Sequence, residues 1–205
     1  MPNPSSDIAF TPTVKAIQQE RGSRDAYARM EAGGGFRTEI DERLIAMLAA
    51  TNTAYLGTAN ADGQPYIQHR GGPRGFIRVI DERTIGFADY TGNRQYVSAG
   101  NLQDNEKAFL FLMDYARKAR IKVWGRARFS YDPDVIARLM PGDYKARPEA
   151  AILFEISAWD VNCPQHIPVK FDADQVAAAL AERDEEIERL KGELADLRTK
   201  YGEAK

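Results

Sequence analysis

The segment from residue 53 to residue 171 constrains the fold most strongly, because it alternates short apolar runs with turn signals. The runs that predict strands are 54–59, 64–70, 76–80, 84–89, 108–114, 119–129 and 152–160. Between the first two runs, Asn60-Ala61-Asp62-Gly63 is typical of a hairpin turn. Many short strands with few helices favour a closed barrel over a doubly wound sheet. The expected fold class is therefore mainly β, a β-barrel with flanking helices.

Helical patterns flank and interrupt this segment. One helix is expected from Pro12 to Glu31, because the triple glycine at 33–35 is a strong helix breaker. A second is expected from Glu39 to Ala50, with Thr38 as its N-cap and an apolar face formed by Ile40, Leu44, Met47 and Leu48. Shorter helices are expected after Gly92-Asn93 and over 133–140.

The last 33 residues have a different pattern, with apolar side chains at heptad spacing. Leu180, Ile187, Leu194 and Tyr201 recur every seven residues, and Arg183, Leu190 and Leu197 occupy the interleaved positions. This pattern predicts a coiled-coil-like helix, which either packs on its own domain or associates with another chain. The predicted organisation is an N-terminal helical extension (1–35), a barrel domain (36–172) and a C-terminal helix (173–205).

Composition excludes several classes of function. The net charge of −2 gives no global attraction to nucleic acid or acidic membranes, so neither is an expected partner. The single cysteine, Cys163, excludes an internal disulfide and a cysteine metal cluster, and two histidines are too few for a three-histidine metal site. The first ten residues are polar, and no run approaches the length of a membrane span. A cytoplasmic protein is expected.

The segment Gly92-Asn93-Arg94-Gln95-Tyr96-Val97-Ser98 is the strongest candidate site for an anion. A strand ends before it, and Asn93 is a good N-cap for the helix expected after it. Arg94 would then lie in the first turn, where a cation opposes the helix dipole unless an anion is present. The Asn93 and Ser98 side chains, free backbone N–H groups and a guanidinium would together form a phosphate site. The alternative is a surface helix start with an incidental arginine.

Four further segments carry polar groups in unusual places. Arg78 lies within an apolar strand, where it needs either an anion or solvent, and the bend from His69 to Gly75 is rich in glycine and donors. Arg120, Lys122, Trp124, Arg126 and Arg128 share one face of a strand, which is either solvated or a wall for a planar anionic cofactor. The loop Asn162-Cys163-Pro164-Gln165-His166 presents amide, thiol and imidazole groups.

Taken in this order, these segments resemble the FMN-binding split barrel of pyridoxamine 5′-phosphate oxidase and its relatives. The resemblance is carried by 57–65, by the strand 73–78, and by Gly86-Phe87-Ala88-Asp89 followed by Gly92-Asn93-Arg94, and it covers about 36–171. The bend 68–73 and the ending 162–166 are similar to an uncharacterised subgroup of these flavoproteins.

The resemblance implies FMN as the cofactor. It implies that 73–78 passes beside the flavin ring, that Ala88 and Asp89 contact the flavin, and that Asn93, Arg94 and Gln95 form the phosphate-binding turn. Arg120 falls where the oxidase has a flavin-contacting glutamine. The residues expected to bind the cofactor are His69, Arg70, Pro73, Arg74, Gly75, Phe76, Ile77, Arg78, Ala88, Asp89, Asn93, Arg94, Gln95, Ser98, Arg120, Gln165 and His166.

The sequence also departs from the oxidase. Pro73 replaces an arginine, Gln95 replaces a lysine, and the tail lacks the oxidase's substrate-binding ending. These changes disfavour pyridoxamine phosphate as the substrate. In this family two subunits share each flavin, which implies a homodimer. The expected function is an FMN-dependent oxidoreductase acting with a nicotinamide or small-molecule substrate, with Arg78, His166 and Cys163 as catalytic candidates. The alternatives are a non-catalytic flavin-binding, storage or regulatory protein and a haem-degrading split-barrel protein.

Overall fold

The computed structural model describes residues 3–161 and 163–202, which form two compact units. The first unit spans Met1–Asp114 and Lys118–Ile167, and the second spans Tyr115–Arg117 and Pro168–Lys205. The helices are η1 (Ser5–Ile8), α1 (Pro12–Glu20), α2 (Arg24–Ala32), α3 (Glu42–Ala50), α4 (Val97–Asp104), α5 (Pro133–Leu139) and α6 (Ala173–Tyr201). The strands are β1 (Thr53–Ala59), β2 (Pro65–Gly71), β3 (Arg78–Val79), β4 (Thr84–Tyr90), β5 (Lys107–Asp114), β6 (Ala119–Ser130) and β7 (Pro148–Val161).

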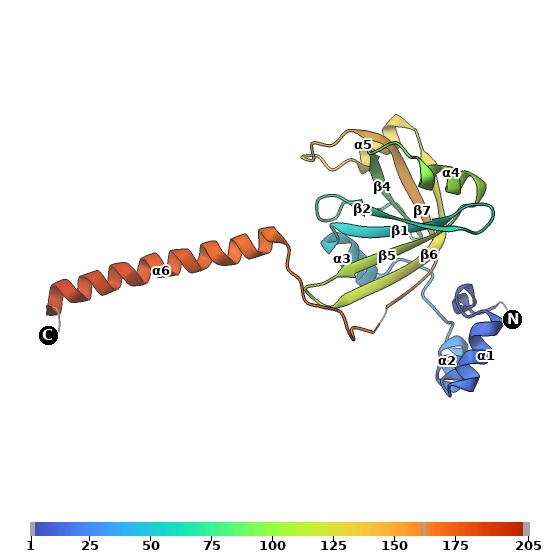
Figure 1. The fold of residues 1–205 in the computed structure, drawn as a ribbon, viewed down its shortest axis with the longest axis horizontal. Coiled ribbons are helices and arrows are strands. Elements are labelled where there is room, and N and C mark those ends of the chain that lie inside the picture. Colours follow the sequence, from blue (N-terminus) through green and yellow to red (C-terminus); the bar gives the residue numbers. More distant parts are fainter. Residues whose placement is uncertain (1–2, 162, 203–205) are drawn as a thin grey trace. The chain divides into compact units, whose positions relative to one another are not determined.

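The strands form one seven-stranded sheet in the order β2-β1-β5-β6-β7-β4-β3, and every neighbouring pair is antiparallel (Figure 1). Burial alternates along β1, where Ala54, Leu56 and Thr58 are buried and the residues between them are partly exposed. This alternation arises because successive side chains of a strand point to opposite faces of the sheet. The predicted fold class, mainly β with flanking helices and a C-terminal helix, is confirmed.

One predicted strand is shorter than expected. The apolar run Phe76–Ile80 was expected to be a strand throughout, but only Arg78 and Val79 pair with β4. Phe76 and Ile77 instead enter the core, where they are 1% and 2% exposed. The run is apolar because it is buried, and an apolar run alone does not distinguish a strand from a buried irregular segment.

Helix α3 contributes its apolar face to the core of the sheet. Leu44, Met47 and Leu48 of the predicted apolar face are buried. The helix begins at Glu42, later than expected, because Asp41 is its N-cap in place of Thr38. The Asp41 carboxylate accepts hydrogen bonds from the backbone N–H groups of Arg43 and Leu44, each at 3.0 Å.

A tryptophan on β7 anchors the chain that leads into α3. Trp159 is fully buried, and its indole Nε1 donates to the carbonyl oxygen of Glu39 at 2.7 Å. The guanidinium of Arg37 lies over the same ring, 4.9 Å from the centroid. The backbone of Arg37 also pairs with that of Trp159 as an isolated bridge. This segment is therefore fixed to the sheet before α3 begins.

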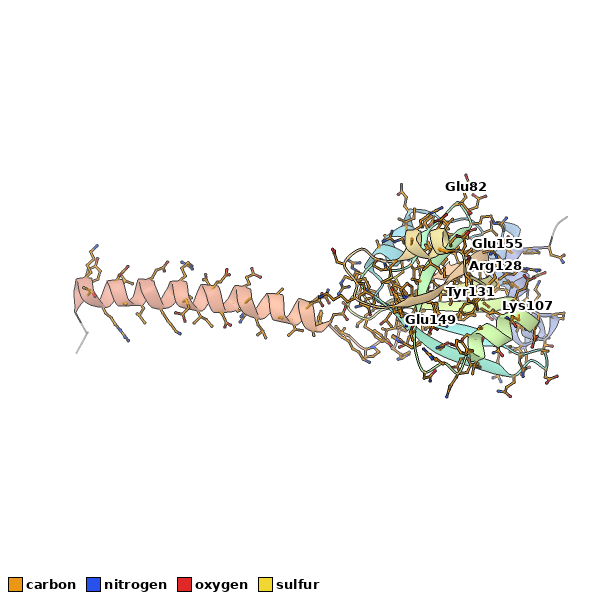
Figure 2. The ribbon with its side chains drawn as sticks, turned by 90° about the horizontal axis from the view of Figure 1, so that it is seen from above. Glu82, Lys107, Arg128, Tyr131, Glu149 and Glu155 are labelled. Carbon is orange, nitrogen blue, oxygen red and sulfur yellow. The ribbon has the colours of Figure 1, made fainter. Side chains whose placement is uncertain are left out.

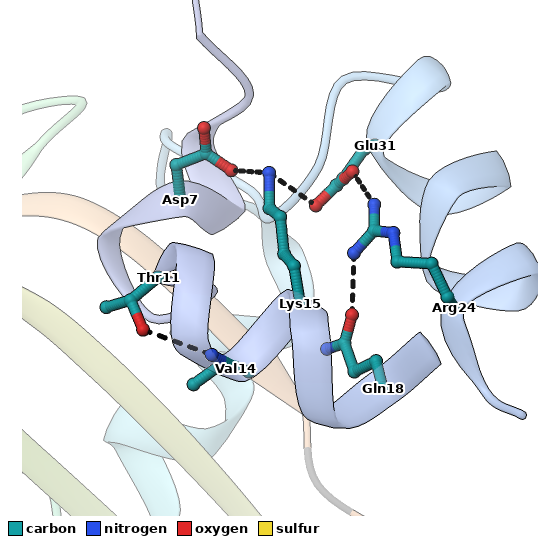
Figure 3. Close-up of polar contacts among 7 residues, drawn as sticks. All are labelled: Asp7, Thr11, Val14, Lys15, Gln18, Arg24 and Glu31. Carbon is teal, nitrogen blue, oxygen red and sulfur yellow. Dashed lines mark hydrogen bonds and ion pairs between the residues drawn. The ribbon is translucent and has the colours of Figure 1, made fainter. Parts of the chain in front are cut away.

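The single N-terminal helix predicted from Pro12 to Glu31 is wrong. The chain forms α1 and α2, separated by Gly22, whose φ of +74° lies in the left-handed region. Charged side chains tie the two helices to η1 (Figure 3): Lys15 Nζ lies 2.6 Å from Asp7 and 3.2 Å from Glu31, and Arg24 also pairs with Glu31.

Aromatic rings connect these helices to the outer face of the sheet. Phe10 packs edge-on against both Tyr27 and Phe36, with centroids 5.1 and 5.3 Å apart. Phe36 in turn stacks on Trp124 of β6 at 5.2 Å with an interplanar angle of 7°. The N-terminal helices thus belong to the same compact unit as the sheet.

In the second unit, α6 is a continuous helix of 29 residues. It starts with a capping box, in which Asp172 and Gln175 exchange side-chain-to-backbone hydrogen bonds. Lys170, just before the helix, lies 4.7 Å from the ring centroid of Tyr115. Among the helices that the structure describes, none combines the length and apolar character needed to cross a membrane.

Candidate functional site

A cleft of about 320 Å³ opens beside β2, the end of β4, the following loop and the start of α4. The residues that line it are Tyr66, Gln68, Arg70, Asp89, Tyr90, Gly92, Asn93, Arg94, Gln95, Tyr96, Val97, Ser98, Ala99, Phe129 and Glu149. Six predicted site residues therefore meet at one place: Arg70, Asp89, Asn93, Arg94, Gln95 and Ser98.

The loop before α4 differs from the prediction in its backbone. Asn93 does not cap the helix, because its side chain accepts a hydrogen bond from the N–H of Gln95 at 3.3 Å. Arg94 and Tyr96 both have positive φ values, 59° and 53°, and the helix begins only at Val97. Arg94 therefore precedes the helix, whereas the sequence predicted it in the first turn.

The N-terminus of α4 faces the cleft without a side-chain cap. Its N-cap residue is Tyr96, which offers no side-chain hydrogen bond, and Val97, Ser98 and Ala99 of the first turn line the cleft. First-turn N–H groups have no partner within a helix and carry partial positive charge. Arg94 lines the same cleft and makes no ion pair within the described part of the chain. These groups together favour an anion.

An ion pair also lines the cleft. Arg70 of β2 pairs with Asp89 of β4, and its other terminal nitrogen donates to Gln68 Oε1 at 2.9 Å. The Ser98 hydroxyl donates to the same Gln68 oxygen at 2.7 Å. The Ser98 hydroxyl thus bonds to a residue of β2, whereas we expected it to bind a phosphate.

Burial alters the acid–base behaviour of Asp89 and Tyr90. Removal from water raises the pKa of the Asp89 carboxyl; the neighbouring Arg70 opposes this rise, and Glu149 adds to it. Burial also raises the pKa of Tyr90, with a further contribution from Tyr144, whose ring lies 5.2 Å away. The Tyr90 hydroxyl is buried and has no hydrogen-bond partner among the described residues, so it could bond to a ligand.

Arg78 does not line the cleft. Its guanidinium donates to the carbonyl oxygens of Arg138, at 3.1 Å, and Met140, at 3.5 Å, at the C-terminal end of α5. A cation at this end of a helix is favourable, because the last carbonyl groups carry partial negative charge. The contact gives Arg78 a structural role, and its proposed position beside a flavin stays a prediction.

The other predicted cofactor residues also lie outside the cleft lining. His69 points to the opposite face of β2 from Arg70 and packs edge-on against Tyr55 at 5.9 Å. His166 is exposed with a φ of 62°, Cys163 is exposed, and Asn162 lies outside the described residues. The remaining residues of this group are Pro73, Arg74, Gly75, Phe76, Ile77, Ala88, Arg120 and Gln165.

Several residues of the cleft were not predicted from the sequence. Tyr66 and Gln68 share a strand face with Arg70, so the two-residue period of β2 could have identified them. Phe129 and Glu149, the latter labelled in Figure 2, come from β6 and β7. No local sequence pattern indicates those two, because only the register of the sheet brings them to the cleft.

The basic face of β6 is largely neutralised by neighbouring acids. Lys122 pairs with Asp160 at 3.0 Å, and Arg126 pairs with Glu106. Arg128 and Glu155, both labelled in Figure 2, line a smaller depression of about 120 Å³. Phe36 covers the part of this face around Trp124, whereas Arg126 and Arg128 are exposed to solvent.

Comparison with known families identifies the barrel. The model of the pyridoxamine 5′-phosphate oxidase family matches residues 40–163, more than half of the chain. The chain belongs to this family. Members of the family commonly bind flavin. No curated protein matches the sequence significantly.

Solved structures that are similar to this chain share little sequence with it. HupZ from Group A Streptococcus is 18% identical, with a TM-score of 0.50 over 64% of this chain and 99% of its own. An FMN-binding protein from Syntrophomonas wolfei is 13% identical over 76% and 98%, with a TM-score of 0.46. A Clostridium acetobutylicum protein related to general stress protein 26 is 16% identical over 67% and 99%, with a TM-score of 0.45.

Proposed function

We propose that this protein is a homodimeric flavoprotein that binds FMN in the cleft and uses it as an oxidoreductase. The observation that carries the proposal is the uncapped N-terminus of α4 beside Arg94. A phosphate monoester is dianionic near neutral pH, and both groups favour negative charge. The FMN phosphate therefore fits the residues present.

Each group at this end of the cleft has a distinct role. Arg94 supplies a charge-assisted hydrogen bond, and the N–H groups of Val97 and Ser98 supply fixed donors. Neutral Asn93 and Gln95 add amide groups without further charge. Arg70 is already neutralised by Asp89, so the phosphate meets one uncompensated arginine. Removal of Arg94 should therefore lower the affinity for FMN strongly.

The cleft volume supports a site completed by a second subunit. About 320 Å³ is at the lower end of the range of about 300–1,000 Å³ for small-molecule sites. In the family two subunits share each flavin, and this cleft lies beside β2, an edge strand of the sheet. We infer that the partner subunit covers the rest of the cofactor.

The outer face of β2, β1 and β5 offers an apolar surface for this dimer. Ile67 and Phe109 lie on either side of Gly57 in the neighbouring strands. Tyr55, two residues before Gly57, lies opposite Phe111, so these four large side chains share one face. Ile67 is 70% exposed, a high value for a large apolar side chain in the middle of a strand. Contiguous apolar surface of this kind favours a protein interface.

In the proposed reaction FMN supplies hydride or electron transfer, and the protein supplies binding and orientation. Arg78, His166 and Cys163 remain the catalytic candidates proposed from sequence. The electron donor is proposed to be a nicotinamide or another small molecule.

Two measurements test the proposal in order. Purified protein should be yellow, and denaturation should release FMN rather than FAD or riboflavin; a colourless preparation that also fails to bind added FMN would contradict the central claim. Anaerobic addition of NADH or NADPH should then bleach the flavin, and turnover with an acceptor should follow. Bound FMN that no nicotinamide reduces would favour the storage alternative.

A further inference from the structure

Helix α6 presents a continuous apolar stripe along its length. The positions Val176, Leu180, Arg183, Ile187, Leu190, Leu194, Leu197 and Tyr201 follow alternating steps of four and three residues. All but Arg183 are apolar, and these apolar side chains are between 44% and 72% exposed. This spacing is the a/d seam of a coiled coil, with Leu180, Ile187, Leu194 and Tyr201 at a positions.

Such a helix is not stable by itself. An isolated helix in water gains little from its own hydrogen bonds, and most helices in proteins are stabilised by packing of an apolar face. No residue of α6 is buried in the structure, and its seam is exposed from Val176 to Tyr201. The seam therefore requires a partner helix of matching period.

We propose that α6 forms a parallel, in-register, two-stranded coiled coil with α6 of a second copy of this chain. The residues flanking the seam carry complementary charge for this arrangement. Glu186 and Glu193 occupy g positions, and Lys191 and Arg198 occupy e positions. A parallel dimer brings each g residue to the e residue five positions later in the other helix. Glu186 then meets the partner's Lys191, and Glu193 meets the partner's Arg198.

An antiparallel dimer lacks this complementarity. With the seams fully overlapped, Leu180 would lie opposite the partner's Leu197, and g positions would face g positions. Glu186 would meet the partner's Glu193, and the twofold symmetry would repeat this repulsive contact. The e positions would also face each other, where Asp184 meets the partner's Lys191, so attractive and repulsive contacts would be equal in number. Neighbouring like charges on helices are destabilising. The charge pattern thus selects the parallel arrangement.

The intrahelical ion pairs do not compete with this arrangement. Arg189, at a c position, bonds to both oxygens of Glu186, at 2.6 and 2.7 Å, and also to Glu193. Lys191 pairs with Glu188 of its own helix at 2.8 Å. Each carboxylate oxygen has two lone pairs and can accept from a second cation across the interface. The Lys191 ammonium has three donors, so it can bond to Glu188 and to the partner's Glu186 together. Arg183 interrupts the seam at a d position, where its long stem can cover apolar surface while its charged end stays in water. It lowers the stability of the coiled coil without changing its register.

Disulfide trapping in the full-length protein tests the orientation. Cys163 is exposed, so it is first replaced by alanine. Leu197→Cys places a thiol at a core d position, and Gly192→Cys provides the matched control at an outward f position where a side chain meets no atom within 4 Å. Under mild oxidation, we expect Leu197→Cys to form a covalent dimer at least about tenfold faster than the control, because only core thiols approach within disulfide geometry.

A mixed sample distinguishes the other arrangements. Cross-linking of Leu197→Cys only when Leu180→Cys is also present would show antiparallel helices and overturn the proposal. Equal rates for Leu197→Cys and Gly192→Cys would show that the helices do not pair, even if another interface makes the protein dimeric. Neither outcome depends on flavin, so failure here is separate from failure of the proposed function.

Discussion

Arg70 and Asp89 form an ion pair between two strands that are far apart in the order of the sheet. Arg70 lies on β2, the first edge of the sheet, and Asp89 lies on β4, next to the other edge. No described backbone ladder joins β2 to β4. Side chains therefore connect the two ends of the curled sheet, and α4 adds hydrogen bonds from Ser98 to Gln68 and from Asn101 to Thr58.

Breaking this ion pair should destabilise the barrel. In Arg70→Met the Asp89 carboxylate loses its partner in a site where the two side chains are only 12% and 16% exposed. Removing one member of a buried pair costs about 3–5 kcal/mol, and the residual exposure of the two side chains predicts a loss of about 3 kcal/mol. Urea unfolding at neutral pH measures the difference. In the double variant Arg70→Met/Asp89→Leu most of the loss should be recovered, whereas an equally unstable double variant would show that Arg70 acts by packing alone.

The raised pKa of Asp89 predicts the sign of a pH effect. The folded protein binds the Asp89 proton more tightly than the unfolded chain, whose pKa is near the ordinary value of 3.8. Stability from this group is therefore fully present below that value and is lost as pH rises through the raised pKa of the folded state. As pH rises through this interval, the free energy of unfolding of Asp89→Asn should increase relative to that of the wild type. Unfolding at several pH values measures this difference. The opposite trend would mean that pairing with Arg70 outweighs burial.

The bulge at Gly125 should tolerate no side chain. The register of β6 with β7 shifts between Trp124 and Gly125, and a Cβ at Gly125 would overlap the carbonyl oxygen of Glu155. Gly125→Ala should therefore cost at least about 3 kcal/mol by overpacking or prevent folding. Gly100→Ala is the control, because it lies in α4 with open space around it. That change should stabilise the protein by about 0.5–1 kcal/mol, as expected for glycine replaced in a helix.

Local patterns in the sequence were sufficient to predict the elements of the sheet. The period of two along β1 and β6 and the turn at Asn60–Gly63 placed the strands within a few residues. Errors arose where a single residue decides an end: Gly22 splits the N-terminal helix, and Asp41 replaces Thr38 as a cap. Both helix ends depend on the backbone conformation of one residue, which the apolar pattern of its neighbours does not indicate.

The cleft was only partly predictable for a different reason. Asn93, Arg94 and Gln95 are contiguous, so a local motif identified them. Phe129 and Glu149 reach the cleft through the pairing of distant strands, and the link between Arg70 and Asp89 depends on how the sheet curls. Arg78 illustrates the converse, because an arginine in an apolar run suggested a ligand but contacts the end of α5.

Removal of residues 173–205 should leave the barrel folded and dimeric. This segment lies in the second compact unit, whereas the proposed barrel interface uses β2, β1 and β5 of the first. A coiled coil of about three heptads containing Arg183 adds stability but is too short to be the sole basis of the dimer. Light scattering of the truncated protein should report two chains. A folded monomer would show that α6 provides the dimerisation.

Arg94→Ala should weaken binding of FMN much more than binding of riboflavin. If Arg94 contacts the phosphate beside the N-terminus of α4, the change removes a charge-assisted hydrogen bond worth about 1.5–3 kcal/mol. The affinity for FMN should then fall about 10- to 150-fold. Riboflavin has the same ring system without the phosphate, so its affinity should change little. Fluorescence titration of the two ligands measures both effects.

Two other arginines make this test specific. Arg43→Ala removes an exposed arginine from α3, outside the cleft lining, and should leave both affinities unchanged. Arg78→Ala should lower affinity for both flavins or alter flavin reduction if Arg78 approaches the ring, because the ring is common to the two ligands. If Arg78 only binds the carbonyl oxygens at the end of α5, its loss should reduce stability and leave the ratio of the affinities unchanged. Equal losses of FMN and riboflavin affinity in Arg94→Ala would place the phosphate elsewhere, since only a contact to the phosphate distinguishes the two ligands.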